Sequence, residues 1–264
     1  MSSLLVHPAG DGTLVSVTPE SAGWTYVGLE VLLLDEGQTV ERDTAGRECC
    51  IVLVAGKGHV RSEHGDWRDL GGRETPFAGA PHAAYLPPRT PFAVEGAAGG
   101  LEVALCTAPA GAGAEPRMLP GEESEVEVRG YGAQERSVTA ILMGDRAADS
   151  LLVCEVLTPP GHWSSYPPHK HDRDALPEES LLEETYYHRI EPAQGFALQR
   201  VYTADGTLDE PIVVRDRDVV LVPRGYHTVS APPGYTDYYL NVMAGPVRTW
   251  AIANDPDHEW TLRP

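Results

Sequence analysis

Turn-forming residues recur at short intervals along this sequence, and their spacing is the strongest constraint on the fold. The chain of 264 residues contains 27 Gly and 23 Pro, which separate short runs rich in Val, Leu, Tyr and Thr. These runs show little helical periodicity, and many short strands joined by turns are typical of a β-sandwich or β-barrel. We therefore predict an all-β chain with strands that include Tyr26–Leu34, Cys50–Ala55, Leu101–Thr107, Ser124–Gly130, Leu151–Leu157, Glu184–Ile190, Phe196–Thr203, Asp218–Val222 and Asp237–Ala244.

A stretch of small residues with Pro and Gly divides the chain. It runs from Thr107 to Pro120, and its composition is typical of a linker. The two sides share a loose order of features, in which an apolar strand leads to a Gly turn and a later apolar run ends at a Pro turn. We interpret them as two copies of one β-barrel, with an N-terminal barrel at 1–108, a linker at 109–122 and a C-terminal barrel at 123–264.

Charge and cysteine content restrict the partners and the compartment. The formal net charge of −19 argues against binding to a nucleic-acid backbone, but an anionic metabolite needs only a local cluster of cations. No apolar run reaches the roughly 18–20 residues of a membrane span, and no secretory signal opens the sequence. The four cysteines form no Cys-x-x-Cys pair and fit buried free thiols. We expect a cytoplasmic protein that binds neither nucleic acid nor membrane.

Histidine is concentrated in the second half of the chain, where six of the ten lie between His162 and His258. His169 and His171 stand two residues apart in Pro-Pro-His-Lys-His-Asp, and alternation along a strand places both on one face. Two imidazoles spaced in this way can bind one metal ion. The alternative interpretation is a pair of surface histidines in a Pro-rich loop.

Two later segments add polar side chains that favour the metal site. Glu184, Tyr186 and His188 alternate onto one face of a predicted strand. A carboxylate inside a barrel needs a partner, because an unpaired buried carboxylate is costly, and a metal ion would supply it. The apolar run 218–222 then leads through Pro-Arg-Gly to His227, where Gly permits a tight turn.

His-x-His, an inward Glu and Pro-x-Gly-x-His, in this order, resemble the two sequence motifs of the cupin superfamily. Glu184 follows His171 by 13 residues rather than by a few, and an inserted loop at 173–180 would account for the difference. The second half is also similar to the 5-deoxy-glucuronate isomerases of inositol catabolism, which are related to the uronate ketol-isomerases of the pectin pathway. The matching stretches are Ser165–Asp172, Leu182–Tyr187, Gly195–Tyr202, Val222–His227, Tyr238–Pro246 and Asp255–Trp260.

This resemblance implies a bicupin built of two double-stranded β-helix (jelly-roll) barrels. It implies that the protein converts 5-deoxy-D-glucuronate to 2-deoxy-5-keto-D-gluconate, an aldose–ketose isomerisation. It also implies one divalent metal ion held by four residues of the C-terminal barrel, with Glu183 as the alternative acidic ligand to Glu184. The implied ligands are His169, His171, Glu184 and His227.

Three neutral imidazoles and one carboxylate suit Zn²⁺, Mn²⁺, Fe²⁺ or Ni²⁺, and an octahedral ion would keep two open positions. Our hypothesis is that the metal chelates the carbonyl and adjacent hydroxyl oxygens of the substrate and, as a Lewis acid, stabilises an enediolate while a base moves the proton. A hydride shift is the rival route. Tyr186, Arg200 and Arg248 are candidates for substrate contact or proton transfer, and Arg224 is a further candidate to hold the substrate carboxylate.

The N-terminal half lacks a matching set. The segments Arg47–Ile51 and Pro87–Pro91 stand where the two motifs are expected, and neither contains His. We therefore expect a structural or interface barrel without metal. Two other functions compete with the isomerase, a cupin oxygenase that uses the same metal with dioxygen and a non-catalytic cupin that binds a sugar acid, because a fold does not fix a function. The expected partners are a small sugar acid and further copies of the chain in a homo-oligomer.

Overall fold

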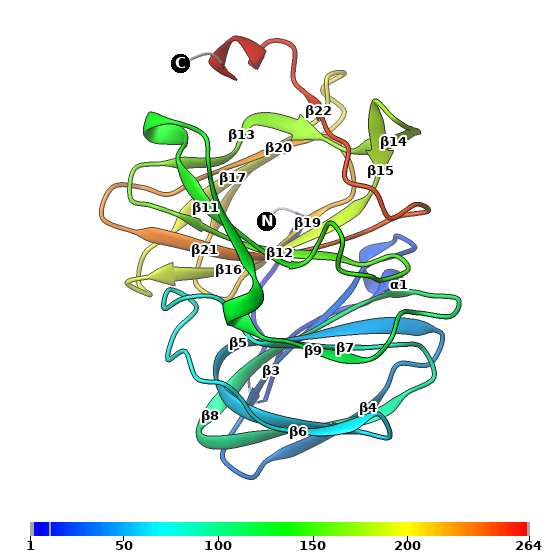
Figure 1. The fold of residues 1–264 in the computed structure, drawn as a ribbon. Coiled ribbons are helices and arrows are strands. Elements are labelled where there is room, and N and C mark those ends of the chain that lie inside the picture. Colours follow the sequence, from blue (N-terminus) through cyan, green and yellow to red (C-terminus); the bar gives the residue numbers. More distant parts are fainter. Residues whose placement is uncertain (1–2, 11, 263–264) are drawn as a thin grey trace. The chain divides into compact units, whose positions relative to one another are not determined.

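Nearly all of the ordered elements of this protein are β-strands (Figure 1). The structure is a computed structural model that describes residues 3–10 and 12–262. Within these residues the only α-helix is the single turn α1 at Pro19–Ala22, and short 3₁₀ turns lie at Gly121–Glu123, Gly132–Gln134 and Glu259–Leu262. No helix in this part of the chain has the length and apolar character needed to cross a bilayer. The prediction of an all-β chain is confirmed, and each predicted strand lies in or overlaps an observed one.

The chain folds into two compact units, each of which we describe by itself. The N-terminal unit contains Ala9–Glu125 and Thr139–Cys154, and the C-terminal unit contains Met1–Pro8, Val126–Val138 and Glu155–Pro264. These bounds differ from a simple division at a 109–122 linker, since residues 117–119 form a strand of the N-terminal unit and the start of the chain joins the C-terminal unit. The outer bounds of the predicted barrels, residues 1 and 264, lie outside the described residues.

The N-terminal unit is built on two long antiparallel strands, β5 and β8, which pair with each other and with most of the others. Its sheet runs in the order β2-β3-β8-β5-β7-β9, with β4 paired to β8 and β6 paired to β5. The strands are β2 (Thr13–Val17), β3 (Gly28–Leu34), β4 (Thr39–Asp43), β5 (Arg47–Ser62), β6 (Gly65–Gly71), β7 (Ala83–Leu86), β8 (Pro91–Pro109) and β9 (Arg117–Leu119).

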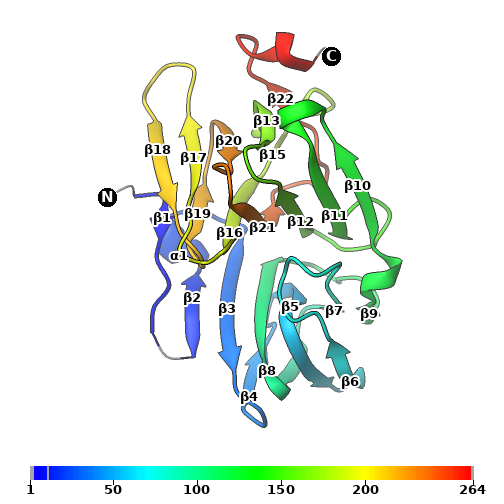
Figure 2. The same ribbon diagram turned by 90° about the vertical axis from the view of Figure 1, so that its left-hand side faces the viewer.

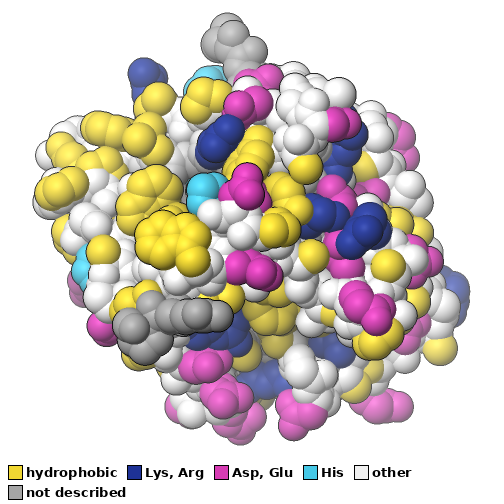
Figure 3. Space-filling model, turned by 90° about the horizontal axis from the view of Figure 1, so that it is seen from above, with side chains coloured by type: hydrophobic (Ala, Val, Ile, Leu, Met, Phe, Trp, Pro, Cys, Tyr) yellow, Lys and Arg dark blue, Asp and Glu magenta, His cyan; other side chains and the backbone are white. Residues whose placement is uncertain are grey.

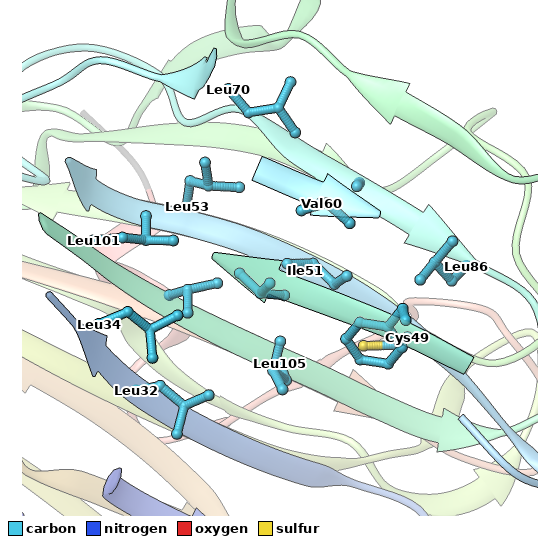
Figure 4. Packing of buried hydrophobic residues seen from close by; sticks show 14 residues of the cluster. Leu32, Leu34, Cys49, Ile51, Leu53, Val60, Leu70, Leu86, Leu101 and Leu105 are labelled. Atoms are coloured by element: carbon cyan, nitrogen blue, oxygen red, sulfur yellow. The ribbon is translucent and has the colours of Figure 1, made fainter. Parts of the chain in front are cut away.

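A large apolar cluster fills most of the N-terminal barrel. Alternate residues of β5, among them Cys49, Ile51 and Leu53, pack against Leu101 and Leu105 of β8 in one buried cluster (Figure 4). At Gly56 the backbone takes φ 88°, and an added Cβ would lie 2.1 Å from the carbonyl oxygen of residue 100, so only glycine fits where β5 and β8 shift register.

Two sheets form the barrel of the C-terminal unit (Figures 1 and 2). One sheet runs β1-β19-β16-β21-β12-β11-β10, and the other runs β18-β17-β20-β13-β22, with β14 and β15 as a separate pair. The strands are β1 (Leu5–Val6), β10 (Glu125–Arg129), β11 (Arg136–Leu142), β12 (Leu152–Thr158), β13 (Trp163–Lys170), β14 (Asp172–Ala175), β15 (Glu179–Leu181), β16 (Glu183–Glu191), β17 (Ala197–Tyr202), β18 (Asp209–Val214), β19 (Val219–Val222), β20 (Tyr226–Ser230), β21 (Thr236–Ala244) and β22 (Ala253–Asn254).

The start of the chain belongs to this second barrel because it completes one edge of a sheet. β1 pairs antiparallel with β19, and Leu4 is buried in the same apolar cluster as Val220 and Tyr186. His7 Nδ1 lies 2.8 Å from the carboxylate of Asp218. The surface seen in Figure 3 carries acidic and basic side chains between areas of hydrophobic side chains.

Candidate metal centre

The two histidines of the His-x-His motif lie at the end of β13, which holds His169 in register with His227 of β20. β13 ends at Lys170, and His171 follows it directly. Lys170 turns to the other side, where its Nζ donates to the carboxylates of Asp172 (2.6 Å) and Glu179 (2.7 Å). The predicted alternation is therefore present, with both imidazoles on one face and the lysine on the other.

Glu184 reaches the histidines from β16. Its partners in the neighbouring strands are Val222 and Met243, and its side chain is only 3% exposed. The predicted loop insertion at 173–180 is a short hairpin, β14–β15, and the backbone N–H of Leu182 donates to the carbonyl of His171 at 2.9 Å. The hairpin thus brings the chain back beside His171, so two side chains 13 positions apart in the sequence touch.

The turn before His227 depends on Gly225. This residue takes φ 89°, and a Cβ there would lie 2.5 Å from the carbonyl oxygen of Tyr202. Its N–H donates to a carboxylate oxygen of Asp172 at 2.8 Å, which ties the turn to the end of the His-x-His segment. Glycine is required here both by the backbone conformation and by the close approach of β17.

Three imidazoles lie together, and one carboxylate contacts two of them. Glu184 Oε2 lies 3.0 Å from His171 Nε2 and 3.2 Å from His227 Nε2. The ligand atoms of His169, His171 and His227 all lie within 4.8 Å of one another, and the four side chains are at most 9% exposed. The cluster is therefore able to bind a metal ion, since imidazole nitrogen and carboxylate oxygen are donors that divalent metals such as Zn²⁺ accept at about 2.0–2.2 Å.

One atom of the cluster supports this fit directly. His227 Nε2 is fully buried and close to Glu184 Oε2, yet its geometry makes no hydrogen bond. A buried polar nitrogen without a partner is costly unless another group occupies the space that it faces. A cation between the imidazoles and the carboxylate would satisfy this nitrogen and the carboxylate together.

The electrostatics of the cluster favour a neutral imidazole at His169 and a charged pair at His171 and Glu184. Burial, together with the nearby His227 and His171, holds the pKa of His169 well below its ordinary value. Burial also opposes charge on His171 and Glu184, but their mutual hydrogen bond outweighs it. The pKa of His171 is raised, and that of Glu184 falls to about 2. The carboxylate is ionised at neutral pH, as a metal ligand must be.

The other predicted residues lie at very different places. The ring of Tyr186 is buried 5.7 Å from that of His227, and its hydroxyl lies 3.1 Å from Ser165 Oγ. Arg200 is half exposed and forms a bidentate ion pair with Asp209. Exposed Arg224 donates to a threonine hydroxyl, and half-buried Arg248 lies beyond β21. Among these residues, Tyr186 contacts an imidazole of the cluster.

Arg136, which was not predicted from the sequence, has the properties expected of a residue that binds the substrate carboxylate. It lies on β11 two residues before Val138, which packs on the core of the C-terminal barrel, so both point to the same side. Its only hydrogen bond goes to the Gln134 carbonyl (3.1 Å), and none of the described carboxylates forms an ion pair with it. Burial lowers its pKa, and the hydroxyls of Tyr239 and Tyr186 are within electrostatic range. No local pattern around Arg136 could have identified it.

The register of the N-terminal barrel shows which residues stand at the corresponding positions there. Arg42 corresponds to His169, because Arg42 pairs with Phe92 in the N-terminal barrel and His169 pairs with His227 in the C-terminal one. Cys49 corresponds to Glu184, because each pairs with the last residue of the neighbouring strand, β7 or β19. Thr44 follows Arg42 as His171 follows His169. The His pair therefore corresponds to β4, and the 47–51 segment corresponds to the strand of Glu184. Arg42 is already paired with Glu30 at 2.6 Å, beside a cavity of about 340 Å³.

Comparison with known proteins places these observations in a family. The chain matches the model of the KduI/IolB family over residues 4–261. It is 54% identical over 257 residues to a protein of Geobacillus thermodenitrificans named 5-deoxy-glucuronate isomerase, covering 97% of this chain and 93% of the relative. A protein of the same name from Bacillus subtilis strain 168 is 46% identical, with 97% and 96% covered.

Solved structures agree on the architecture. The crystal structure of an IolB-like protein from Salmonella typhimurium superimposes with a TM-score of 0.96 at 44% identity, covering 98% of this chain and 99% of that one. An oxalate decarboxylase from Lactobacillus farciminis matches with a TM-score of 0.64 at 12% identity, over 96% and 89% of the two chains. The second likeness concerns the fold alone, and it agrees with an all-β bicupin. By its sequence over nearly the whole length, the chain belongs to the KduI/IolB family.

Proposed function

We propose that this protein is a metal-dependent aldose–ketose isomerase that converts 5-deoxy-D-glucuronate to 2-deoxy-5-keto-D-gluconate in inositol catabolism. The observation that carries the proposal is the buried cluster of three imidazoles and a carboxylate, His169, His171, His227 and Glu184, in a chain 46–54% identical to proteins named for this reaction. These four residues would hold one divalent ion, which sequence and geometry leave as Zn²⁺, Mn²⁺, Fe²⁺ or Ni²⁺. When bound, it would supply Lewis-acid polarisation of a substrate carbonyl.

Hydroxyl groups beside the cluster are suited to orient a sugar. Ser165 Oγ lies 3.1 Å from the Tyr186 hydroxyl and 3.4 Å from that of Tyr239. Burial raises the pKa of Tyr239, so this hydroxyl stays protonated and can donate. Ser165 itself has φ 48°, a conformation that costs a non-glycine residue about 1–3 kcal/mol and recurs at functional sites. We assign substrate contact and proton transfer to Tyr186 within this group.

The substrate carboxylate needs a cation, and we assign this role to Arg136. It is partly buried and forms no ion pair with a described carboxylate, although Glu127 acts on it from within electrostatic range, and an anionic ligand would supply the missing partner. A guanidinium fork binds a carboxylate through two parallel hydrogen bonds. Arg200 is less suited to this task because Asp209 already occupies its fork.

An anaerobic assay tests the proposal. Purified protein with its metal content measured is mixed with 5-deoxy-D-glucuronate, and formation of the ketose is followed without oxygen. We expect turnover that is abolished by chelation and restored by one of the four metals. Turnover that requires dioxygen would favour the oxygenase, and binding without turnover would favour a non-catalytic cupin. Incorporation of solvent deuterium into the product separates proton transfer from a hydride shift.

Two further expectations belong to the same proposal. A cytoplasmic location fits the four cysteines, which are all free and buried. The homo-oligomer is tested by light scattering, since a monomer has a mass of 28.5 kDa.

A further inference from the structure

A second polar cluster lies inside the C-terminal barrel, next to the candidate metal centre. His188 is fully buried, with Nδ1 3.0 Å from Asp237 Oδ1 and Nε2 3.0 Å from Gln199 Oε1. Asp237 and Gln199 are each 1% exposed. The three side chains come from β16, β21 and β17, so residues distant in sequence converge on one imidazole.

Burying this polar cluster inside the barrel costs stability. Asp237 Oδ2 and Gln199 Nε2 are buried without any hydrogen-bond partner, and burial raises the pKa of Asp237 even though the nearby His188 opposes the shift. Buried polar groups that are only partly satisfied weaken a core, and well-packed apolar side chains in their place are often as stable or more stable. Packing alone therefore gives no reason for His188 and its partners.

The N-terminal barrel provides an internal comparison for this point. His188 corresponds to Leu53, because His188 pairs with Tyr239 where Leu53 pairs with Val103. Gln199 corresponds to Val60, because the two pair with equivalent residues of β20 and β8. Two residues before Val103 stands Leu101, as Asp237 stands two residues before Tyr239. Leu53, Val60 and Leu101 all belong to the apolar core (Figure 4). At these three positions the same fold is filled with leucine and valine.

The contacts of His188 lead to the candidate site. Its ring stacks on Tyr186 with centroids 6.0 Å apart and an interplanar angle of 19°, and it meets Tyr239 at 5.5 Å. Tyr186 in turn meets the ring of His227 at 5.7 Å. Asp237 and Gln199 fix the plane of the imidazole, and the imidazole is the platform on which Tyr186 lies.

We propose that His188, held by Asp237 and Gln199, is a positioning residue that keeps the Tyr186 hydroxyl aimed at the substrate beside the metal centre. The inference rests on the proposed function. Behind metal-ligating histidines, hydrogen-bonded carboxylates and carbonyls fix the ring, and their loss typically costs about 10–100-fold in metal affinity or activity. We expect a loss of about the same size when the imidazole beneath Tyr186 loses its partners. A tyrosine on a fixed platform is also held in the orientation that the reaction needs, which lowers the barrier of the chemical step rather than the affinity for substrate.

The test replaces the cluster with the residues of the other barrel. The triple variant His188→Leu, Gln199→Val, Asp237→Leu is compared with wild type in Tm, bound metal, KM and kcat. We expect an equal or higher Tm, bound metal and KM within about twofold, and kcat lowered about 10–100-fold. A purely structural cluster would give the opposite pattern, a lower Tm with unchanged kcat, and that result would overturn the proposal.

A conservative variant covers the case in which the triple variant does not fold. Asp237→Asn keeps the shape of the side chain but replaces a charged acceptor for His188 Nδ1 by a neutral, weaker one, so we expect a folded protein with kcat lowered at least about threefold and with KM unchanged. Wild-type kcat in folded Asp237→Asn would refute the positioning role.

A crystal structure of the triple variant provides a readout besides activity. We expect the contact of 3.1 Å between Tyr186 and Ser165 to be lost. A Tyr186 that has not moved would overturn the inference. Absence of turnover in wild type would instead contradict the proposed function, so the two failures are distinguishable.

Discussion

Glu184 and Glu183 are neighbours on β16 whose side chains point to opposite faces of the strand, and they offer the sharpest test of the candidate metal centre. Gln has the same size as Glu but no charge, and its amide oxygen is a weaker donor to a divalent cation. If the four-residue cluster binds metal, Glu184→Gln should lose most of its metal-dependent stabilisation. Glu183→Gln, made in the same strand one residue away, should keep it.

The expected difference is large enough to measure by calorimetry. A ligand that binds only the folded state adds about 2.7 kcal/mol when its free concentration is 100 times Kd. Loss of a group that only hydrogen-bonds a ligand weakens metal binding about 10–100-fold, so loss of a direct carboxylate ligand should weaken it about 100-fold or more. The same metal concentration then adds at most about 0.4 kcal/mol. For a chain of this length 1 kcal/mol shifts Tm by about 2–4 °C, so the metal-dependent rise should fall from about 5–11 °C to about 1–2 °C.

The assay starts from protein freed of metal by chelation and dialysis. Each of Zn²⁺, Mn²⁺, Fe²⁺ and Ni²⁺ is added back in turn, and the transition of the C-terminal unit is followed beside the bound metal per chain. The reasoning fails if Glu184→Gln keeps the full rise in Tm. It fails equally if Glu183→Gln is the variant that loses the rise, because the acidic ligand would then lie on the opposite face.

Other predictions follow from single contacts. Arg136→Gln should raise KM for the sugar acid about 10–100-fold, the equivalent of a charge-assisted hydrogen bond of about 1.5–3 kcal/mol, whereas Arg200→Gln should leave steady-state KM unchanged. The pKa of Glu184, about 2 in the folded protein against an ordinary 4.5, means that this carboxylate contributes about 3 kcal/mol that metal-free wild type loses as pH falls from 4.5 toward 2. Other carboxylates with lowered pKa values, such as Asp205, titrate in both proteins, so urea unfolding should show a loss that is larger by about this amount in wild type than in Glu184→Gln. Gly225→Ala should destabilise the protein by more than about 1 kcal/mol in urea unfolding, and Gly206→Ala, at a similar φ but in open space, should cost clearly less.

The alternation of side chains along a strand explains why the candidate ligands could be predicted from the sequence. A period of two assigns faces without any knowledge of the neighbouring strands, so His169 and His171 were expected together and Glu184 apart from Glu183. The glycine before His227 is a similarly local signal, because a tight turn and a positive φ leave a mark in the residue type. Each of these inferences needed only a few consecutive residues.

The other features of the fold and the site depend on contacts between residues far apart in the sequence, and no local sequence pattern indicates such contacts. Arg200 and Arg136 both lie on observed β-strands, yet one meets Asp209 and the other makes no ion pair among the described residues. The membership of β1 in the C-terminal unit depends on its pairing with β19, some 210 residues away. Gln199 and Asp237 likewise become partners of His188 only when three strands are in register.

Comparison of the two barrels distinguishes the residues that the fold requires from those that a functional site requires. Where one barrel has Glu184, Tyr186 and His188 in succession on β16, the other has Cys49, Ile51 and Leu53 on β5, all three buried. The apolar version is closed and stable by packing, so the polar version is not required by the architecture. Burying a carboxylate, a hydroxyl and an imidazole costs stability unless each finds a partner, and the histidines that Glu184 contacts form the group in the described chain that could hold a cation beside that carboxylate. The polarity of the C-terminal interior is therefore best explained by a ligand that the fold itself does not supply.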